Sequence, residues 1–246
     1  MLCVKAEKCG IVVLFAGLEN GLTAVGTVGC ELCFQTECAV SLTLQTALER
    51  VVAFHEVGGV ELDTRLVGVE GQRAVQYVRY FAEDFGIDPD KIALCGFSAG
   101  GHLSVMVAEH PVTENLVGDV IGEVRSTPDA CILAYPVTTL GEGTFETMPR
   151  IFLGENLGNA EETAKYSYPH AIDTMPPTFV FYSVKDQFVN FEANSIAFAD
   201  AMTAAGRDVT IAAYEDGGHG IGLGTQYNDY SRWHADSAAF LENHGF

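Results

Sequence analysis

From about residue 73 onward, the apolar positions alternate between short unbroken runs and longer stretches with helical spacing. Runs of about five apolar residues are typical of strands buried on both faces of a sheet. Stretches with an apolar residue at every third or fourth position are typical of the helices that cover such a sheet. The expected strands are 92–95, 130–135, 178–182 and 209–214, and the expected helices are 74–85, 98–110, 191–205 and 230–244. This alternation predicts a mostly parallel sheet with helices on both faces.

Two parts of the chain have no such regularity. Residues 137–177 combine glycine, proline and polar clusters, and we expect an irregular connection there. In the first 72 residues, the apolar run 11–15 predicts a strand, and 42–54 predicts a helix or a strand followed by a helix. No internal repeat or linker divides the chain, so a single domain over 1–246 is expected.

The composition narrows the classes of partner. Hydrophobic residues make up 48% and charged residues 19%, as in soluble globular proteins. The net charge of -20 has the same sign as nucleic acid, so no nucleic-acid partner is expected. No apolar run approaches the roughly 18 residues that span a bilayer, so we expect no membrane partner. The run 11–18 follows two lysines but is short for a signal peptide, and a cytoplasmic location is expected. The oligomeric state is not predicted.

The cysteines raise the question of a metal or redox site. Five of the seven lie within the first 38 residues, and Cys30 and Cys33 form a C-x-x-C pair. A zinc site needs four ligands, and no second pair follows at a suitable interval. A redox pair is typical of a thioredoxin-like βαβ unit, which the surrounding pattern does not predict. Ordinary thiols are therefore expected, with neither a metal nor an organic cofactor.

Candidate chemistry lies in the motif Gly96-Phe97-Ser98-Ala99-Gly100, between an expected strand and an expected helix. A sharp strand-to-helix turn holds a serine hydroxyl clear of the sheet, and the helix N-terminus offers N–H groups to a developing oxyanion. Such a turn requires small residues around the serine, and this motif supplies them. We therefore predict Ser98 as a nucleophile and the N–H of Ala99 as an oxyanion donor.

A serine nucleophile needs a general base and a group that orients the base. Asp186 follows the expected strand 178–182, at the carboxyl edge where sites of open α/β sheets collect. His219 follows the strand 209–214 and lies among glycines. This order, with the acid first and the histidine last, fits a serine hydrolase. Asp216 and Glu215 remain alternatives for the acid.

Two further histidines lie on the helix that follows Ser98. His102 is one turn into that helix, and we expect it to pack behind the site rather than to take part in chemistry. His110 precedes a proline at the expected helix end, where we expect it to act as a cation.

The motif around Ser98, extended through Leu103 and preceded by Gly86-Ile87-Asp88-Pro89, resembles the acetylxylan-esterase-like branch of the α/β hydrolases. That branch includes bifunctional carbohydrate esterases that act on acetyl and feruloyl groups of xylan. The resemblance covers about residues 73–246 and includes Leu153-Gly154-Glu155, Pro176-Pro177-Thr178-Phe179, Lys185-Asp186, Gly217-Gly218-His219-Gly220 and Trp233. It implies a three-layer α/β-hydrolase fold, with Ser98 as nucleophile, Asp186 as acid, His219 as base and no cofactor.

The first 72 residues depart from the pattern of this family. The family places a glycine-rich loop after an early strand, and one backbone N–H of that loop completes the oxyanion hole. The corresponding stretch 15–21 holds isolated glycines only, and Gly17 is the candidate for the second donor. Because the resemblance begins abruptly near Arg73, we hypothesise that the N-terminal third is read in a shifted frame. Translation of the other two upstream frames tests this hypothesis.

The resemblance and the motif together favour a serine carboxylic-ester hydrolase. The expected reaction is deacetylation of a carbohydrate, such as acetylated xylan, through an acyl-serine intermediate on Ser98. The expected partner is therefore a small-molecule or carbohydrate ester. Two alternatives stay open at this point: a serine peptidase of the prolyl-oligopeptidase type, and a non-catalytic binding protein that keeps the fold but has a defective oxyanion loop.

Overall fold

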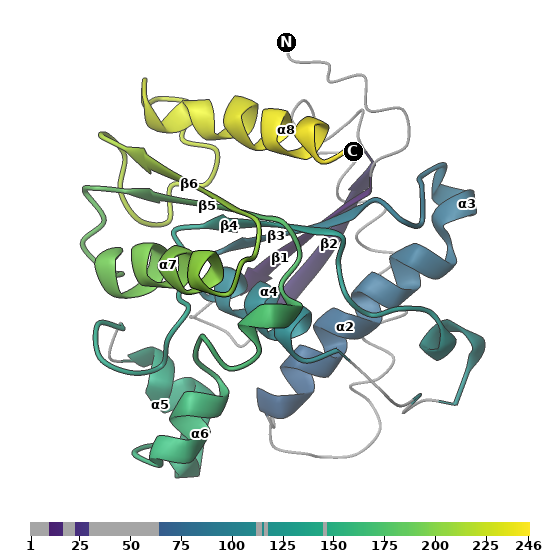
Figure 1. Cartoon of the computed structure of the whole chain (residues 1–246), viewed down its shortest axis with the longest axis horizontal. Helices are drawn as coiled ribbons and strands as arrows, with labels where there is room; N and C mark the ends of the chain where they lie inside the picture. The colour runs from purple at the N-terminus through teal and green to yellow at the C-terminus, as the bar shows by residue number, and fades with distance from the viewer. Residues whose placement is uncertain (1–9, 17–22, 30–63, 112–114, 116–117, 145–146) are drawn as a thin grey trace.

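The computed structural model describes residues 10–16, 23–29, 64–111, 115, 118–144 and 147–246. Its described strands form one sheet in the order β2-β1-β3-β4-β5-β6 (Figure 1). The bounds are β1 Gly10–Ala16, β2 Thr23–Gly29, β3 Ile92–Phe97, β4 Ala130–Ala134, β5 Thr178–Ser183 and β6 Val209–Tyr214. Strand β2 pairs antiparallel with β1, and every other neighbouring pair is parallel.

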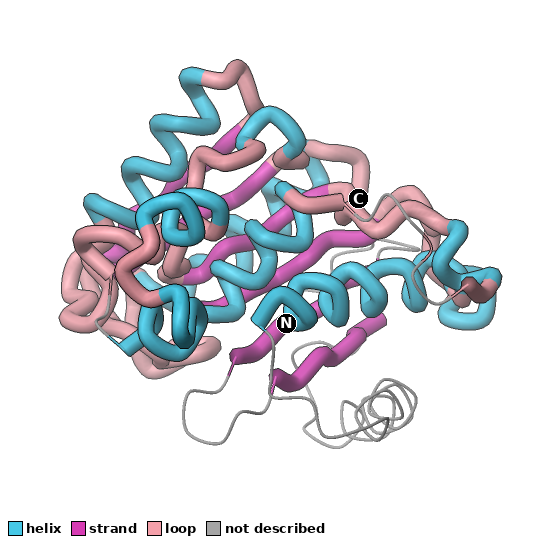
Figure 2. Tube along the Cα trace, turned by 90° about the horizontal axis from the view of Figure 1, so that it is seen from below, coloured by secondary structure: helices cyan, strands magenta, loops and turns pink. Residues whose placement is uncertain are grey.

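Helices cover both faces of this sheet. Figure 1 shows α8 on one face and α2, α4 and α7 on the other, and Figure 2 shows the strands side by side with helices packed against them. The long helices are α2 Thr64–Tyr80, α4 Ala99–Glu109, α7 Ala197–Ala204 and α8 Trp233–Asn243, and the four-residue helix α3 Ala82–Phe85 follows α2. The predicted three-layer α/β-hydrolase fold is thus confirmed. None of the helices in the described part of the chain is both long and apolar enough to cross a membrane.

The alternation of side chains along each strand separates the core into two clusters. In β3, Ile92 and Leu94 pack with Val75 and Val78 of α2, and the same cluster includes Phe198 of α7. The intervening β3 residues belong to the opposite cluster, together with Phe179 and Phe181 of β5 and Trp233, Phe240 and Leu241 of α8. Because both faces are covered, β3, β4 and β5 are buried at nearly every position, and most of their residues are apolar. Each fully buried large side chain contributes roughly 1.5–3 kcal/mol.

Strands β3, β4, β5 and β6 lie where the apolar pattern places them. The helix expected at 74–85 is instead α2, which begins at Thr64, followed by the separate helix α3, and the connection 137–177 also differs from the expectation. The strand expected at 11–15 is β1. The stretch expected to be irregular contains α5 Thr147–Leu153 and α6 Ala160–Lys165, so that expectation is wrong. These helices are too short for a periodic pattern to emerge. A capping signal was nevertheless present, since the side chain of Asn159 accepts from the N–H groups of Glu161 and Glu162.

The remaining short elements are single helical turns. They are η1 Val120–Glu123, η2 Gly154–Asn156, η3 Ile172–Thr174, η4 Glu192–Ile196 and η5 Tyr230–Arg232. Of these, η4 is a π-helical turn that leads directly into α7, and η5 leads into α8. The helix expected at 191–205 is therefore η4 followed by α7, and the helix expected at 230–244 is η5 followed by α8. Strand β2 was not expected from the sequence, and the helix or strand plus helix expected at 42–54 lies outside the described residues.

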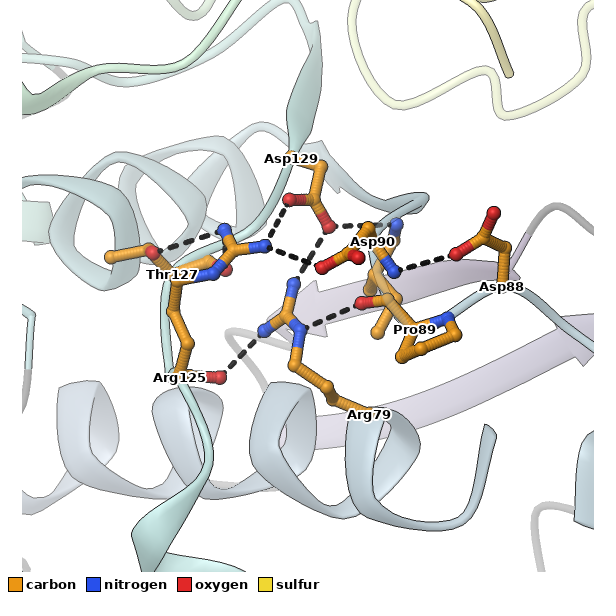
Figure 3. Close-up of polar contacts among 8 residues, drawn as sticks. Arg79, Asp88, Pro89, Asp90, Arg125, Thr127 and Asp129 are labelled. Atoms are coloured by element: carbon orange, nitrogen blue, oxygen red, sulfur yellow. Dashed lines mark hydrogen bonds and ion pairs between the residues drawn. The ribbon is translucent and has the colours of Figure 1, made fainter. Parts of the chain in front are cut away.

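A buried ion pair fastens α2 to the amino ends of β3 and β4 (Figure 3). The guanidinium of Arg79 lies 2.7 Å from the carboxylate of Asp129, with side-chain exposures of 6% and 13%. Arg79 also donates to the carbonyl of Pro89 at 2.8 Å, and Asp129 accepts from the N–H of Ile92 at 3.0 Å. Burial lowers the pKa of Arg79, and Asp129 opposes this effect. The ion pair therefore holds α2 against the amino ends of the strands, whereas Ser98 lies at their carboxyl ends.

Arg79→Ala is expected to lower the free energy of unfolding by about 1–3 kcal/mol, because Asp129 loses its buried partner and keeps only Arg125, whose side chain is 45% exposed. Urea denaturation followed by far-UV circular dichroism measures this change. Arg232→Ala, which breaks the exposed pair with Asp229, is the control and is expected to change stability little. Equal effects of the two substitutions would contradict the role of the buried pair.

Candidate active site

Ser98 lies in a strained turn between β3 and α4. Its backbone has φ 54° and ψ -116°, a region that residues with a side chain rarely adopt. The surrounding backbone holds it there: the Ser98 N–H donates to the carbonyl of Ala134 at 2.9 Å, and the Ser98 carbonyl accepts from Gly101 and Val137 at 2.9 and 3.1 Å. The turn is therefore anchored to β4 as well as to α4, and this anchoring offsets the strain.

The glycines of the motif are required by close packing. A Cβ on Gly96 would lie 2.2 Å from the carbonyl oxygen of Gly100 and 2.3 Å from the hydroxyl of Ser104. A Cβ on Gly101 would lie 2.6 Å from the ring of Pro136. These distances are too short for any side chain, so the small residues allow α4 to start directly against β3 and the loop after β4. The spacing of the motif thus follows from the geometry of the turn.

The structure brings together all three residues expected to carry the chemistry. The Oγ of Ser98 lies 2.7 Å from Nε2 of His219, and Nδ1 of His219 lies 2.7 Å from Oδ2 of Asp186. They follow β3, β6 and β5 respectively, so all three lie at the carboxyl edge of the sheet. The Asp186 side chain is 1% exposed and the His219 side chain 16% exposed. A hydroxyl, an imidazole and a buried carboxylate are therefore connected in one hydrogen-bonded chain.

The carboxylate of Asp186 is fixed by its own loop. Its Oδ1 accepts from the backbone N–H groups of Phe188 and Val189 at 2.9 and 3.0 Å. Val189 is buried beside Ala99 and Leu140, which attaches this loop to the start of α4. Oδ2 is left to face the imidazole. Such an arrangement orients the ring of His219 and can stabilise its protonated form.

The two alternative acids, Asp216 and Glu215, form hydrogen bonds that hold the loop carrying His219. The carboxylate of Asp216 accepts from the backbone N–H groups of Tyr230, Asn228 and Asp229. These hydrogen bonds, that of Tyr230 foremost, lower the pKa of Asp216. The neighbouring Glu215 is held through its backbone, which donates to Asp229 at 2.8 Å. Asp216 therefore ties the loop that carries His219 to the start of α8, while Asp186 contacts the imidazole.

Two aromatic residues that the sequence did not single out flank the imidazole. The ring of Tyr135 meets that of His219 edge to face at a centroid distance of 4.8 Å, and the ring of Phe188 lies 5.8 Å away. Tyr135 is buried, with φ 36°, and its hydroxyl is hydrogen-bonded to the backbone of Gly222 and to Tyr230. Burial raises the pKa of Tyr135 to about 12. The sequence carried one signal for it, because Tyr135 directly follows a strand at the edge that holds the site.

His102 of α4 and His110, which directly follows this helix, differ in how well the sequence predicted their roles. His102 is 1% exposed, its Nε2 lies 2.8 Å from the carbonyl of Tyr166, and burial lowers its pKa to about 4. It packs behind the site as a neutral ring, as expected. His110 stacks on His170 at 4.9 Å, and burial lowers its pKa. The expectation of a helix-terminal cation at His110 is therefore wrong, because burial disfavours the charged ring.

Of the two expected oxyanion donors, the structure describes one. Ala99 is the first residue of α4, where a backbone N–H has no carbonyl partner within the helix. Gly17, the other candidate, lies outside the described residues, as does the Cys30–Cys33 pair. Cys95 and Cys131 are buried thiols in β3 and β4. Among the described residues, no group of three or more histidine, cysteine or acidic side chains is placed to hold a metal ion.

The parallel sheet, the strained serine turn and the position of the site at the carboxyl edge define an α/β hydrolase. The chain belongs to the BD-FAE family, whose model matches residues 70–202, more than half of its length.

The individual proteins that the chain resembles are consistent with its membership of this family. The chain is 33% identical over 165 residues to endo-1,4-beta-xylanase B of Butyrivibrio fibrisolvens, a match to 65% of this chain and 25% of that protein. It is 27% identical over 176 residues to an acetylxylan esterase of Xylanibacter ruminicola, covering 70% of this chain and 34% of the esterase. The chain thus spans between a quarter and about a third of the length of these curated relatives.

Solved structures show the same fold. An acetyl ester-xyloside bifunctional hydrolase from Caldicellulosiruptor lactoaceticus superposes with a TM-score of 0.68 at 32% identity, covering 73% of this chain and 66% of that one. The esterase Est2 of Thermogutta terrifontis, with propionate bound, gives a TM-score of 0.65 at 25% identity and covers 98% of this chain and 85% of its own.

The different partners of the two aspartates lead to a prediction. In Asp186→Asn, the amide no longer favours the tautomer and the protonated form of His219, and ester hydrolysis is expected to fall by about 10⁴-fold. In Asp216→Asn, the loop keeps an oxygen acceptor, and the rate is expected to stay within about 10-fold. Steady-state hydrolysis of p-nitrophenyl acetate measures both rates. A larger loss in Asp216→Asn than in Asp186→Asn would reassign the acid.

Proposed function

We propose that this protein is a serine carboxylic-ester hydrolase that removes acetyl groups from a carbohydrate such as acetylated xylan. The observation that carries the proposal is the hydrogen-bonded chain from Ser98 through His219 to Asp186, with both contacts at 2.7 Å. Nucleophile and base at this separation meet the geometric requirement for acyl transfer. The acetylxylan esterase and the acetyl ester-xyloside hydrolase among the similar proteins support the choice of substrate.

In the proposed reaction, the Oγ of Ser98 attacks the ester carbonyl carbon while Nε2 of His219 takes the hydroxyl proton. The negative charge that develops on the carbonyl oxygen faces the N–H of Ala99. As the tetrahedral intermediate collapses, the bond to the alcohol oxygen breaks, and His219 gives its proton to that oxygen. Water, deprotonated by His219, then attacks the acyl carbon, the bond between that carbon and Oγ of Ser98 breaks, and His219 returns the proton to Oγ as acetate leaves. Asp186 stays ionised and orients the imidazole throughout.

The strength of oxyanion stabilisation sets the rate of this reaction. Removal of one oxyanion donor typically slows acyl transfer by about 100- to 1000-fold. We propose that the N–H of Ala99 is one donor and that the N–H of Gly17 is the other. Gly17→Pro removes the N–H of residue 17. A loss of about 100- to 1000-fold in the rate of ester hydrolysis by Gly17→Pro, with Ser98 still labelled by a fluorophosphonate, would support the assignment.

The proposal is tested by acetate release from acetylated xylan and from p-nitrophenyl acetate. Wild-type protein is expected to hydrolyse both, and Ser98→Ala is expected to lose at least about 10³-fold in rate, because no other group supplies the nucleophile. Wild-type turnover of p-nitrophenyl acetate without release from acetylated xylan would contradict the substrate but not the chemistry. Equal rates for the wild type and Ser98→Ala would contradict the chemistry itself.

A further inference from the structure

In the described part of the chain, two residues with a side chain have a positive φ, and both belong to the site. The first is Ser98, and the second is Tyr135, which directly follows β4 and has φ 36°. A bulky residue in this conformation is a rare outlier, and such strain is concentrated at functional sites. The ring of Tyr135 lies 4.8 Å from the imidazole of His219. One strained residue is thus the proposed nucleophile, and the other contacts the proposed base.

The backbone around Tyr135 is joined to the serine turn. Ala134 accepts from the N–H of Ser98 at 2.9 Å, and Val137 donates to the carbonyl of Ser98 at 3.1 Å. Between these two contacts, the N–H of Tyr135 donates to the carbonyl of Phe181 at 2.7 Å. The segment is therefore held by the serine turn and by β5 together. Its strained backbone places the ring of Tyr135 at a fixed position relative to Ser98.

The ring of Tyr135 is enclosed by protein. Tyr135 is 3% exposed, and its ring centroid lies 5.9 Å from that of Phe97. Its hydroxyl is hydrogen-bonded to the backbone of Gly222 and to Tyr230. Gly222 belongs to the loop that carries His219, so Tyr135 contacts this loop through its ring and through its hydroxyl. A ring with so little exposed surface acts on the reaction through its neighbours rather than by touching a substrate.

The hydrogen bonds of His219 leave its imidazole one way to move. Nδ1 and Nε2 each make one hydrogen bond at 2.7 Å, to the proposed acid and to the proposed nucleophile. Two fixed points define a line, and the ring can still tilt about that line. The adjacent backbone gives little support, because a Cβ on Gly218 or Gly220 would meet no atom within 4 Å. A contact on the ring itself fixes the tilt, and Tyr135 makes a closer one than Phe188, at 4.8 against 5.8 Å.

We propose that Tyr135 is a positioning residue that acts through His219: its ring holds the imidazole in the orientation in which Nε2 faces the Oγ of Ser98. This inference rests on the proposed ester hydrolysis at Ser98. His219 accepts a proton from Ser98 in acylation and from water in deacylation, so Tyr135 supports both steps. A misplacement of about 1 Å can cost about 100-fold in rate. The aromatic ring, rather than the hydroxyl, carries the effect.

The test is a double-mutant cycle between Tyr135 and His219, measured as the rate at which a fluorophosphonate labels Ser98. Tyr135→Leu removes the ring and is expected to slow labelling about 10- to 100-fold. In the His219→Ala background, the same substitution is expected to change the rate less than about 2-fold, because the imidazole through which it acts is absent. A loss of similar size in both backgrounds would overturn the proposal and assign Tyr135 to support of the serine turn. An unchanged rate in Tyr135→Leu alone would overturn it as well.

Rescue by a conservative variant separates the ring from the hydroxyl. Tyr135→Phe keeps the aromatic ring and loses the hydrogen bonds to Gly222 and Tyr230. It is expected to keep the labelling rate and the steady-state hydrolysis of p-nitrophenyl acetate within about 3-fold of the wild type. Equal losses in Tyr135→Phe and Tyr135→Leu would overturn the proposal, because the hydroxyl would then be the group that matters.

Phe179→Leu is the matched control for the loss of a buried ring. Phe179 is 2% exposed and belongs to the same core cluster as Tyr135, and its printed ring contacts are with Phe181 and Phe240 rather than with His219. It is expected to lower the urea midpoint while it keeps the labelling rate within about 2-fold. Equal rate losses in Phe179→Leu and Tyr135→Leu would overturn the proposal, since lost core packing would then be sufficient. Tyr135→Met, with a flexible side chain, is a second ringless variant in case Tyr135→Leu does not fold.

The outcome for the proposed function is separate. Wild-type protein that neither reacts with the fluorophosphonate nor hydrolyses p-nitrophenyl acetate would overturn the proposed function, and the role of Tyr135 with it. Reactive wild-type protein with equal losses in the two backgrounds would overturn the role of Tyr135 and leave the ester hydrolysis in place. Wild-type protein that hydrolyses p-nitrophenyl acetate but not acetylated xylan would contradict the carbohydrate substrate, and the result of the cycle would still decide the role of Tyr135.

Discussion

The strained backbone of Ser98 is the constraint on which the site depends. A positive φ at a residue with a side chain costs of order 1–3 kcal/mol and persists only where the surroundings enforce it. Here the enforcement comes from hydrogen bonds to Ala134 and Val137 and from the close contact of Gly96 with the first turn of α4. The buried strands β3 and β4 therefore do more than form the core. They hold the serine hydroxyl at the carboxyl edge of the sheet, within 2.7 Å of the histidine.

The other two members of the hydrogen-bonded chain are positioned by local backbone contacts rather than by the core. Asp186 is held by two N–H groups of its own loop, and the histidine loop is tied down by Asp216 and by the interior ring of Tyr230. A Cβ on Gly217 or Gly224 would contact that ring at 3.1 or 2.3 Å, which explains why glycine stands at these two positions. These glycines fit the loop closely around Tyr230.

Much of this arrangement could be predicted from the sequence, and the reasons are physical. Strands buried on both faces are mostly apolar, and the turn at Ser98 leaves no room for a side chain at Gly96 or Gly101, so both leave strong local patterns. The partners of Asp186 and Asp216 could not be separated in this way, because both follow strands that end at the same edge. Tyr135 and Phe188 were missed because their roles arise from proximity to His219, which is distant in sequence. The short helices α5 and α6 were missed because one or two turns show no periodicity.

In the N-terminal third, the sequence predicts one of the two described strands and misses the other. The apolar run 11–15 was sufficient to predict β1, whereas the glycine-rich strand β2 lacks the apolar alternation that would predict it. The proposed second oxyanion donor, Gly17, and the hypothesis of a shifted reading frame concern residues where the resemblance to the family ends. Both stay predictions, and the account of Ser98, His219 and Asp186 does not depend on either.

The central claim, that the held turn and His219 together make Ser98 a nucleophile, is tested most directly by its reaction with a fluorophosphonate. The labelled residue is identified by peptide mass spectrometry, and the rate of labelling is compared between the wild type and His219→Ala. The account predicts one adduct, on Ser98, that forms at least about 10³-fold more slowly without the imidazole. An unlabelled wild type, or labelling at an equal rate in both proteins, would contradict it.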